Sequence, residues 1–308
     1  MTVDQLGLFK RKKFEAVIQP QVIELAKPAA DMTVMHTLPT YHAYLKSGGY
    51  SKYTPDDFHG DVKKFALFLP NKHLKDITTQ DIHQWIATLK SPLGGGLTAK
   101  TVSRKLSALN NYFQWLLAEA VLKVSPMYSI TYQRITSPLP DILFDEECER
   151  LLKTASSDSR SFLLVLMLLE TGIKQEELFE LKLRHFDFSN KYAPEMWMKH
   201  TGKKVKKDRK LKLPMEIVPA FHEYVKQYAV AEKLFPFTPR LLRYIITKIA
   251  EKAGIQKKVS PQILRDTFAI RSLKRGEDID RVLEKLGLAP STWEDAKEKY
   301  LKLISKAL

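Results

Sequence analysis

The stretch Ser260-Pro-Gln-Ile-Leu-Arg-Asp-Thr-Phe-Ala-Ile-Arg271 indicates a short turn that runs into an α-helix. Pro261 suits the first helical position, and Ser260 suits the N-cap before it. Four apolar residues of the stretch can form a buried side: Ile263, Leu264, Phe268 and Ile270. That side would set the direction in which Arg265 leaves the helix, and a planar guanidinium held in this way can bind two oxygens of one phosphate. The alternative is an arginine on a solvated helix face.

The composition favours a polyanionic partner. The chain has 308 residues, a formal net charge of +15 and a pI near 9.6. A charge excess of this sign favours nucleic acid, while a ribosome-like or membrane-surface protein is the alternative. Hydrophobic residues make up 44% of the chain, which is enough for one large or two ordinary domains with cores of their own.

Several classes of protein are excluded by what the chain lacks. The single cysteine, Cys148, excludes an intrachain disulfide and a cysteine-based zinc site, and we predict that it is buried and inert. The longest apolar run, Phe162 to Leu169, is too short to span a bilayer. Residues 1–13 lack the hydrophobic core of a signal peptide. We therefore expect a cytoplasmic, nucleoid-associated protein with no membrane partner.

Residues 37–130 have the pattern of a compact four-helix domain, preceded by an N-terminal arm of residues 1–36 to which we assign no function. The first two expected helices run from Thr37 to Ser47 and from a cap at Thr54 to Leu69. The third runs from Asp81 to Leu89, with Thr78 or Thr79 as its cap, and the fourth runs from a cap at Thr98 to about Ala120. One stripe of the last helix is polar and consists of Lys100, Arg104, Ser107 and Asn111. Such a stripe is usually only solvated, but in so basic a protein it can lie along a DNA groove.

A proline-containing linker, residues 131–141, separates this domain from a second one of residues 142–308. The second domain is expected to be mostly helical, with a central helix, Ser161 to Glu170, that is apolar on nearly every side. Met196 to Met198 and Arg209 to Pro214 have the patterns of two strands. The loop between them is crowded with lysines, whose mutual repulsion a nearby anion would relieve.

Five stretches resemble the tyrosine recombinases, the phage-integrase family. Ser260-Pro-x-x-Leu-Arg-x-Thr-Phe-Ala is similar to the second-arginine motif, and Leu169-Glu-Thr-Gly-Ile-Lys-Gln-Glu-Glu-Leu178 to the first, with Lys174 at the arginine position. Leu234 to Pro239 resembles the stretch that precedes the second motif, and residues 44–50 and 97–109 resemble the core-binding domain. The resemblance extends from about residue 37 to residue 300. It implies a mainly α fold with an N-terminal four-helix, SAM-like core-binding domain and a C-terminal α-rich catalytic domain that contains a small antiparallel sheet.

The resemblance also implies a reaction and a set of residues. Tyr300 would attack the scissile phosphate, Arg265 and Lys174 would neutralise its oxygens, and Lys203 of the basic hairpin, with Lys204 as the alternative, would protonate the leaving oxygen. Gln262 stands where the family usually has histidine. The residues expected to bind DNA are Lys100, Arg104, Asn111, Lys204, Lys206, Lys207 and Arg209. The chemistry needs neither a cofactor nor a metal. The expected partners are double-stranded DNA and further copies of the chain, as a dimer or tetramer.

Three positions depart from the family pattern. Lys174 keeps the charge of arginine but lacks its fork of donors, and Gln262 can donate a hydrogen bond but cannot transfer a proton. Leu288 occupies a further position where the family has histidine, and Trp293 is a possible replacement for that group. Three hypotheses follow: a recombinase that is active or weakly active, a DNA-binding protein that has lost the chemistry, and a basic helical scaffold unrelated to DNA.

Overall fold

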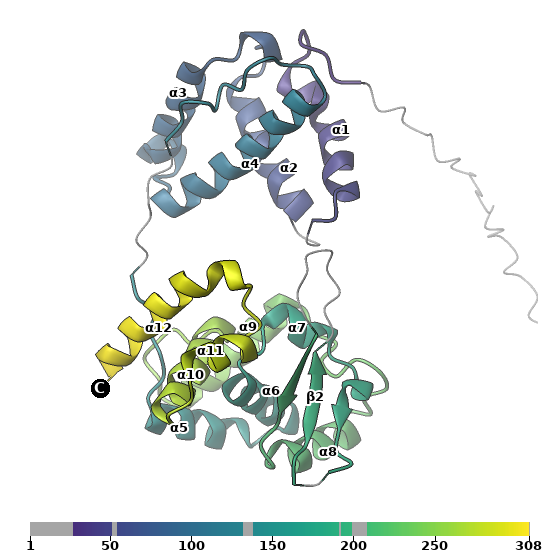
Figure 1. Cartoon of the computed structure of the whole chain (residues 1–308), viewed down its shortest axis with the longest axis vertical. Helices are drawn as coiled ribbons and strands as arrows, with labels where there is room; N and C mark the ends of the chain where they lie inside the picture. Colours follow the sequence, from purple (N-terminus) through teal and green to yellow (C-terminus); the bar gives the residue numbers. More distant parts are fainter. Residues whose placement is uncertain (1–26, 51–53, 132–137, 191, 199–207, 308) are drawn as a thin grey trace, which may run out of the picture. The chain divides into compact units, whose positions relative to one another are not determined.

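The computed structural model describes residues 27–50, 54–131, 138–190, 192–198 and 208–307. The chain divides between Ile135 and Thr136 into two compact units (Figure 1). The fold is mainly helical, as the sequence predicted, and each unit has a hydrophobic core of its own.

The first unit contains the four expected helices. They are α1 (Val34–Ser47), α2 (Thr54–Phe68), α3 (Thr79–Lys90) and α4 (Ala99–Ala118), with 3-10 turns η1 (Leu74–Asp76) and η2 (Pro92–Gly94) between them. Thr98 caps α4 by accepting a hydrogen bond from the backbone N–H of Thr101. Thr78 is the cap of α3, and the carboxylate of Asp81 accepts hydrogen bonds from both its backbone N–H and its hydroxyl.

The apolar stripe of α4 forms much of the first core. Its five members are buried as their helical spacing predicts: Val102, Leu106, Leu109, Phe113 and Leu116. The rings of Phe65 and Trp85, from α2 and α3, pack edge to face at a centroid distance of 5.1 Å in the same core. The first unit is thus a helical domain held together by aromatic and aliphatic side chains.

The second unit has eight helices and a small sheet in its described part. The helices are α5 (Asp145–Ala155), α6 (Ser159–Thr171), α7 (Gln175–Glu180), α8 (Ile217–Gln227), α9 (Pro239–Lys252), α10 (Pro261–Lys274), α11 (Ile279–Lys285) and α12 (Trp293–Ala307), with 3-10 turns η3 (Leu183–His185) and η4 (Pro290–Thr292). Cys148 lies on α5 and is buried, which raises the pKa of its thiol to about 11. The thiol is therefore protonated at neutral pH.

The sheet is antiparallel, in the order β1 (Phe186–Asp187), β2 (Glu195–Met198) and β3 (Arg209–Lys212). The sequence predicted β2 and β3, whereas β1 is too short to show an alternating pattern. Met196 lies opposite Leu211 in the register, and both side chains are buried. On the other face, the ammonium of Lys210 lies 5.1 Å from the centre of the Trp197 ring. The strands therefore have one buried and one solvated face, as expected.

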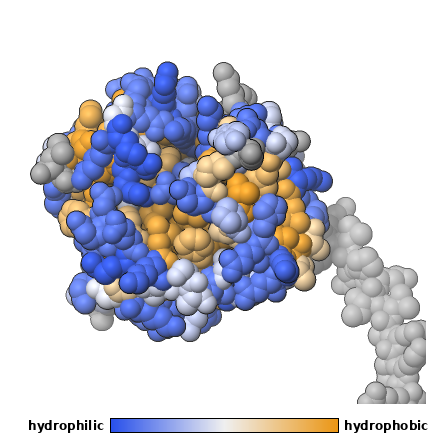
Figure 2. Space-filling model, turned by 90° about the horizontal axis from the view of Figure 1, so that it is seen from below, coloured by the Kyte–Doolittle hydropathy of each residue, from blue (hydrophilic) through white to orange (hydrophobic). Residues whose placement is uncertain are grey.

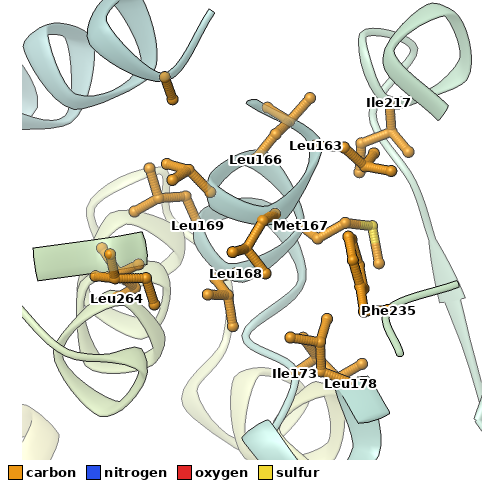
Figure 3. Packing of buried hydrophobic residues seen from close by; sticks show 14 of the residues in the cluster. Leu163, Leu166, Met167, Leu168, Leu169, Ile173, Leu178, Ile217, Phe235 and Leu264 are labelled. Carbon is orange, nitrogen blue, oxygen red and sulfur yellow. The ribbon is translucent and has the colours of Figure 1, made fainter. Parts of the chain in front are cut away.

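Helix α6 is the centre of the second unit (Figure 1). Seven consecutive residues, Leu163 to Leu169, are buried. Figure 3 shows their side chains directed around the helix, toward Leu264 of α10 on one side and Ile217 of α8 on the other. A helix surrounded in this way must be apolar on all faces, which is the pattern that the sequence shows.

A separate hydrophobic cluster joins the last three helices. It consists of Phe268, Ala269 and Ile270 of α10, Val282 and Leu283 of α11 with the following Leu286, and Tyr300 and Leu303 of α12. Because Leu303 is 2% exposed, the chain after Tyr300 packs against its own unit at this point. The cluster fixes α12, and with it Tyr300, against α10.

Hydrophilic side chains dominate the surface shown in Figure 2, and apolar ones appear between them in several patches. None of the helices in the described ranges combines the length and the apolar character that crossing a bilayer requires.

We predict that Gly172→Ala destabilises the protein by about 3 kcal/mol because Gly172 combines a positive φ of 57° with a lack of space. A Cβ at this position would overlap the ring of Phe268 and lie 2.8 Å from the side chain of Leu286. Gly254→Ala is the matched control, since Gly254 has a φ of 68° and no atom within 4 Å of its Cβ position. Urea unfolding should show a clearly larger loss for the first variant; equal losses would mean that packing at Gly172 contributes nothing.

Candidate catalytic site

A pocket of about 590 Å³ in the second unit is lined by residues from several helices and loops. Four of the five residues predicted for catalysis line it: Lys174 before α7, Gln262 and Arg265 of α10, and Tyr300 of α12. The fifth, Lys203, lies outside the described residues, as do three residues predicted to bind DNA: Lys204, Lys206 and Lys207. The fold therefore brings together residues that are far apart in the sequence.

Arg265 is 4% exposed, so it does not lie on a solvated helix face. Its Nη2 donates a hydrogen bond of 2.6 Å to the carbonyl of Leu286, and its Nη1 donates to the carbonyl of Gly172. Burial lowers the pKa of Arg265, although the nearby Tyr300 and Glu177 oppose this effect. A guanidinium remains protonated under these conditions, so a full positive charge is buried at the edge of the pocket.

The carboxyl end of α11 accepts hydrogen bonds from three cationic side chains. Lys174 donates through Nζ to the carbonyl of Gly287 at 2.9 Å. Arg265 donates to the preceding carbonyl, and the Nε of Arg209 donates to the carbonyl of Lys285 at 3.0 Å. The last carbonyls of a helix have no partner within the helix and lie at the negative end of its dipole. Backbone groups thus hold Lys174 and Arg265 side by side at the pocket.

Tyr300 faces a buried carboxylate. Its hydroxyl donates to Oδ1 of Asp266 at 2.9 Å, and the two residues are 3% and 0% exposed. Burial raises the pKa of Tyr300 well above its usual value, the charge of Asp266 raises it further, and Arg265 partly opposes both. Lys299 and Gln262 donate to the same Oδ1 at 2.7 and 3.0 Å. Tyr300 is therefore a neutral phenol in a polar network that joins α10 to α12.

Comparison with known families matches both units. The phage integrase N-terminal SAM-like domain matches residues 38–120, and the phage integrase family domain matches residues 142–292. The chain belongs to the phage integrase, or tyrosine recombinase, family. This agrees with the family and the fold that the sequence motifs predicted.

Curated and solved relatives extend over most of the chain. A tyrosine recombinase of Pseudothermotoga lettingae is 28% identical over 245 residues, which cover 77% of this chain and 84% of the relative. The crystal structure of the XerH site-specific recombinase bound to a palindromic difH substrate superposes with a TM-score of 0.69 at 20% identity, over 89% of this chain and 82% of that one. A lambda integrase tetramer bound to a Holliday junction superposes with a TM-score of 0.66 at 16% identity, over 86% and 77%. The two structural matches show the fold.

The three positions that we expect to differ from the family pattern, Lys174, Gln262 and Leu288, are part of the same pocket. Gln262 hydrogen-bonds Asp266, and the apolar side of Leu288 lines the pocket. The indole N–H of Trp293 donates to the carbonyl of Leu288 at 3.1 Å. In the structure, Trp293 thus uses its only donor on the backbone.

Arg209, which the sequence predicted to bind DNA, forms an ion pair inside the second unit. Its two terminal nitrogens donate to the two carboxylate oxygens of Glu177, each at 2.8 Å, and the side chains are 17% and 19% exposed. A bidentate pair of this kind joins β3 to α7, and the Nε hydrogen bond joins both to α11. Arg209 therefore links β3, α7 and α11 beside the site. A residue that served only to contact DNA would not need these hydrogen bonds.

The four residues of the predicted polar stripe of α4 have different surroundings. Lys100 and Ser107 are exposed. Arg104 is half exposed and forms a 2.7 Å ion pair with the buried Asp61, which also binds Lys105. The Asn111 side chain accepts a hydrogen bond from the Tyr41 hydroxyl and donates one to the Tyr50 hydroxyl. Asn111 thus already has hydrogen-bond partners within its own unit.

Three charged residues at or beside the pocket that bear on its chemistry, Asp266, Lys299 and Arg243, were not predicted from the sequence. Asp266 and Lys299 each stand directly beside a predicted catalytic residue, and that adjacency was the available signal. Arg243 of α9 also lines the pocket. It lies on the exposed side of an amphipathic helix, and in the sequence that side looks like any other solvated helix face. The tertiary structure identifies them by bringing residues of α9, α10 and α12 to one pocket.

We predict that Glu177→Gln destabilises the protein by about 2 kcal/mol at neutral pH, because it removes the anion that pairs with Arg209. Burial acts to raise the pKa of Glu177, but the hydrogen bonds and charge of Arg209 outweigh it and lower the pKa below its usual value. The stabilisation from this lowered pKa is complete above the unfolded-state pKa and disappears as the pH falls through the folded-state pKa.

The wild type should therefore lose more stability than Glu177→Gln when the pH is lowered through this acidic range, as measured by chemical denaturation. Glu176→Gln is the control, since Glu176 is the adjacent carboxylate and is exposed. Parallel stability curves for the wild type and Glu177→Gln would show that this ion pair contributes nothing.

Proposed function

We propose that this protein is a site-specific tyrosine recombinase that cleaves and rejoins double-stranded DNA through a phosphotyrosyl bond to Tyr300. The observation that supports this most directly is the shared pocket, where Lys174, Arg265 and Tyr300 meet from three separate segments. The alternative of a basic scaffold unrelated to DNA does not account for two buried or half-buried cations beside a buried tyrosine.

In the proposed reaction, the Tyr300 oxygen attacks a backbone phosphorus, the bond to the 5′ oxygen breaks, and a 3′-phosphotyrosyl linkage conserves the energy of the broken bond. Arg265 and Lys174 neutralise the non-bridging oxygens as negative charge develops. Both now donate to backbone carbonyls, which are neutral acceptors, and a phosphate with a full negative charge is a stronger one. Lys203 protonates the leaving 5′ oxygen, and attack by another 5′-hydroxyl reverses the steps.

The substitutions at the pocket favour reduced activity. Lys174 provides one point charge where a guanidinium provides a planar fork, and the apolar Leu288 provides no hydrogen bond. These observations also support a second candidate function, in which the protein binds DNA without cleaving it. Covalent complex formation separates the two.

We predict that Tyr300→Phe abolishes covalent protein–DNA complexes while leaving DNA affinity within about threefold, because it removes only the attacking oxygen. Lys174→Arg should increase the yield of the complex about tenfold or more, since a second contact to a phosphate oxygen is worth roughly 1–3 kcal/mol. Both are measured by incubation with a nicked suicide duplex taken from the flanks of the protein's own gene, followed by a denaturing gel.

A covalent complex from Tyr300→Phe would show that another residue attacks. If neither the wild type nor Lys174→Arg forms a complex on this DNA, the protein that binds without cleaving becomes the better conclusion.

We further propose that both units bind DNA and that the protein self-assembles on it, as solved relatives do in dimers and tetramers. The exposed Lys100 and the half-exposed Arg104 of α4 support contacts by the first unit. The lysines of the hairpin between β2 and β3 would supply contacts by the second, together with Arg243 at the pocket. Leu301 of α12 is 56% exposed and is a suitable apolar contact for a neighbouring copy.

We predict that duplex affinity falls steeply with salt and that Lys100→Ala lowers the slope of log affinity against log salt by about one, because one phosphate contact is lost. Lys90→Ala is the control, with the same charge change at an exposed position of α3, and should leave the slope unchanged. Fluorescence anisotropy gives the slopes. An affinity that does not depend on salt would contradict the proposed contacts, and a single complex at saturation in a native gel would contradict self-assembly.

A further inference from the structure

The hydroxyl of Tyr300 has one hydrogen-bond acceptor among the described residues, Oδ1 of Asp266. The family's histidine positions hold Gln262 and Leu288, neither of which can accept a proton from a phenol, and the chain has no histidine after His222. A titratable group at hydrogen-bond distance from the nucleophile is the geometric requirement for a general base. Asp266 meets this requirement.

We propose that Asp266 is the general base that takes the proton of Tyr300 when its oxygen attacks phosphorus. This inference rests on the proposed function, in which Tyr300 is the nucleophile. As the bond between the Tyr300 oxygen and phosphorus forms, the phenolic proton moves to the Asp266 carboxylate. The bond to the 5′ oxygen breaks, and that oxygen takes its proton from the acid on the other side of the phosphate. In the rejoining step, Asp266 returns its proton to the Tyr300 oxygen.

The surroundings of Asp266 suit this exchange. The three side-chain donors, from Tyr300, Lys299 and Gln262, meet at Oδ1, while Oδ2 is buried and receives no hydrogen bond from any described residue. A buried carboxylate with an unpaired oxygen is costly. Proton transfer from Tyr300 converts this anion into a neutral acid at the moment when negative charge passes to the phosphate. The proton is received at Oδ1, the oxygen to which the Tyr300 hydroxyl already donates.

Gln262 and Lys299 act as positioning residues for the carboxylate. Gln262 lies one turn before Asp266 on α10, and its amide donates at 3.0 Å whatever the pH. Lys299 precedes Tyr300 on α12, so its ammonium, 2.7 Å from Oδ1, holds the carboxylate toward the helix that bears the nucleophile. Arg265, the residue before Asp266, lines the pocket in which the phosphate would bind.

A purely structural role is the competing explanation, since the same contacts join α10 to α12. Replacement of the nucleophile by a more acidic phenol separates the two roles. A difluorotyrosine at position 300 loses its proton more readily and depends less on a base, whereas its shape and its attachment to α12 hardly change. Fluorination should therefore compensate for the loss of a base but not for the loss of a helix contact.

The test measures covalent complex formation on the suicide duplex by Asp266→Asn, with tyrosine or difluorotyrosine at position 300. We expect Asp266→Asn to slow cleavage about 100-fold or more with DNA affinity within threefold of the wild type. Difluorotyrosine should reduce this deficit at least tenfold. Asp280→Asn is the matched control because it also removes a carboxylate that pairs with a lysine of α12, Lys297 at 2.8 Å, and it should cleave at the wild-type rate.

Cleavage by Asp266→Asn at or above the wild-type rate would overturn the proposal and would make Asp266 a restraint on Tyr300. A deficit that fluorination leaves unchanged would also overturn it and would assign Asp266 a structural role. If Tyr300→Phe still forms a complex, or the wild type forms none, the proposed function itself fails, and this inference fails with it.

If Asp266→Asn does not fold, Lys299→Gln provides a second measurement. It removes the ammonium that holds the carboxylate 2.7 Å away, on the side of α12. Cleavage should then slow, and difluorotyrosine at position 300 should reduce this deficit, because a more acidic phenol depends less on a well-placed base. A deficit that fluorination leaves unchanged would overturn the proposal.

Discussion

A buried guanidinium needs acceptors for its donors, and the second unit is arranged to supply them to Arg265. The acceptors are the carbonyl of Gly172, where α6 ends, and the carbonyl of Leu286, where α11 ends. Helix ends are suited to this because their last carbonyls have no partner within the helix. One cation thus fixes the ends of two helices against α10, and this requires Gly172, since a side chain there would overlap Phe268.

The same arrangement explains how a polar site is built inside a small domain. Lys174 and Arg209 bind the carbonyls on either side of Leu286, so the end of α11 has cations on three successive carbonyls. Glu177 balances part of this charge through Arg209. Lys174 and Arg265 donate to backbone carbonyls, and these neutral acceptors do not cancel the positive charge that an anion would meet. A phosphate that enters the pocket meets groups that are already in place, which is the condition for electrostatic stabilisation of developing charge.

Much of the fold could be predicted because its signals are local. The stripe of α4, the all-apolar α6 and the caps at Ser260 and Thr98 each depend on residues within a few turns of one another. Strand β1 was missed because two residues cannot show a period, although its partner β2 follows closely in the sequence. The predicted catalytic residues Lys174, Gln262, Arg265 and Tyr300 were found through short motifs that resemble a family, and these motifs do not show what each side chain contacts.

The sequence by itself determined which residues are helical, that the chain has two units with their own cores, and which positions resemble a recombinase site. Only the tertiary structure decided that Arg209 pairs with Glu177, and that Tyr300 donates to Asp266. The physical reason is that helical periodicity fixes which face of a helix is apolar, whereas the partner of a polar side chain depends on where another helix packs. The contacts of Arg209 and Asp266 join segments that are separated by tens of residues, and no local pattern specifies such a pair.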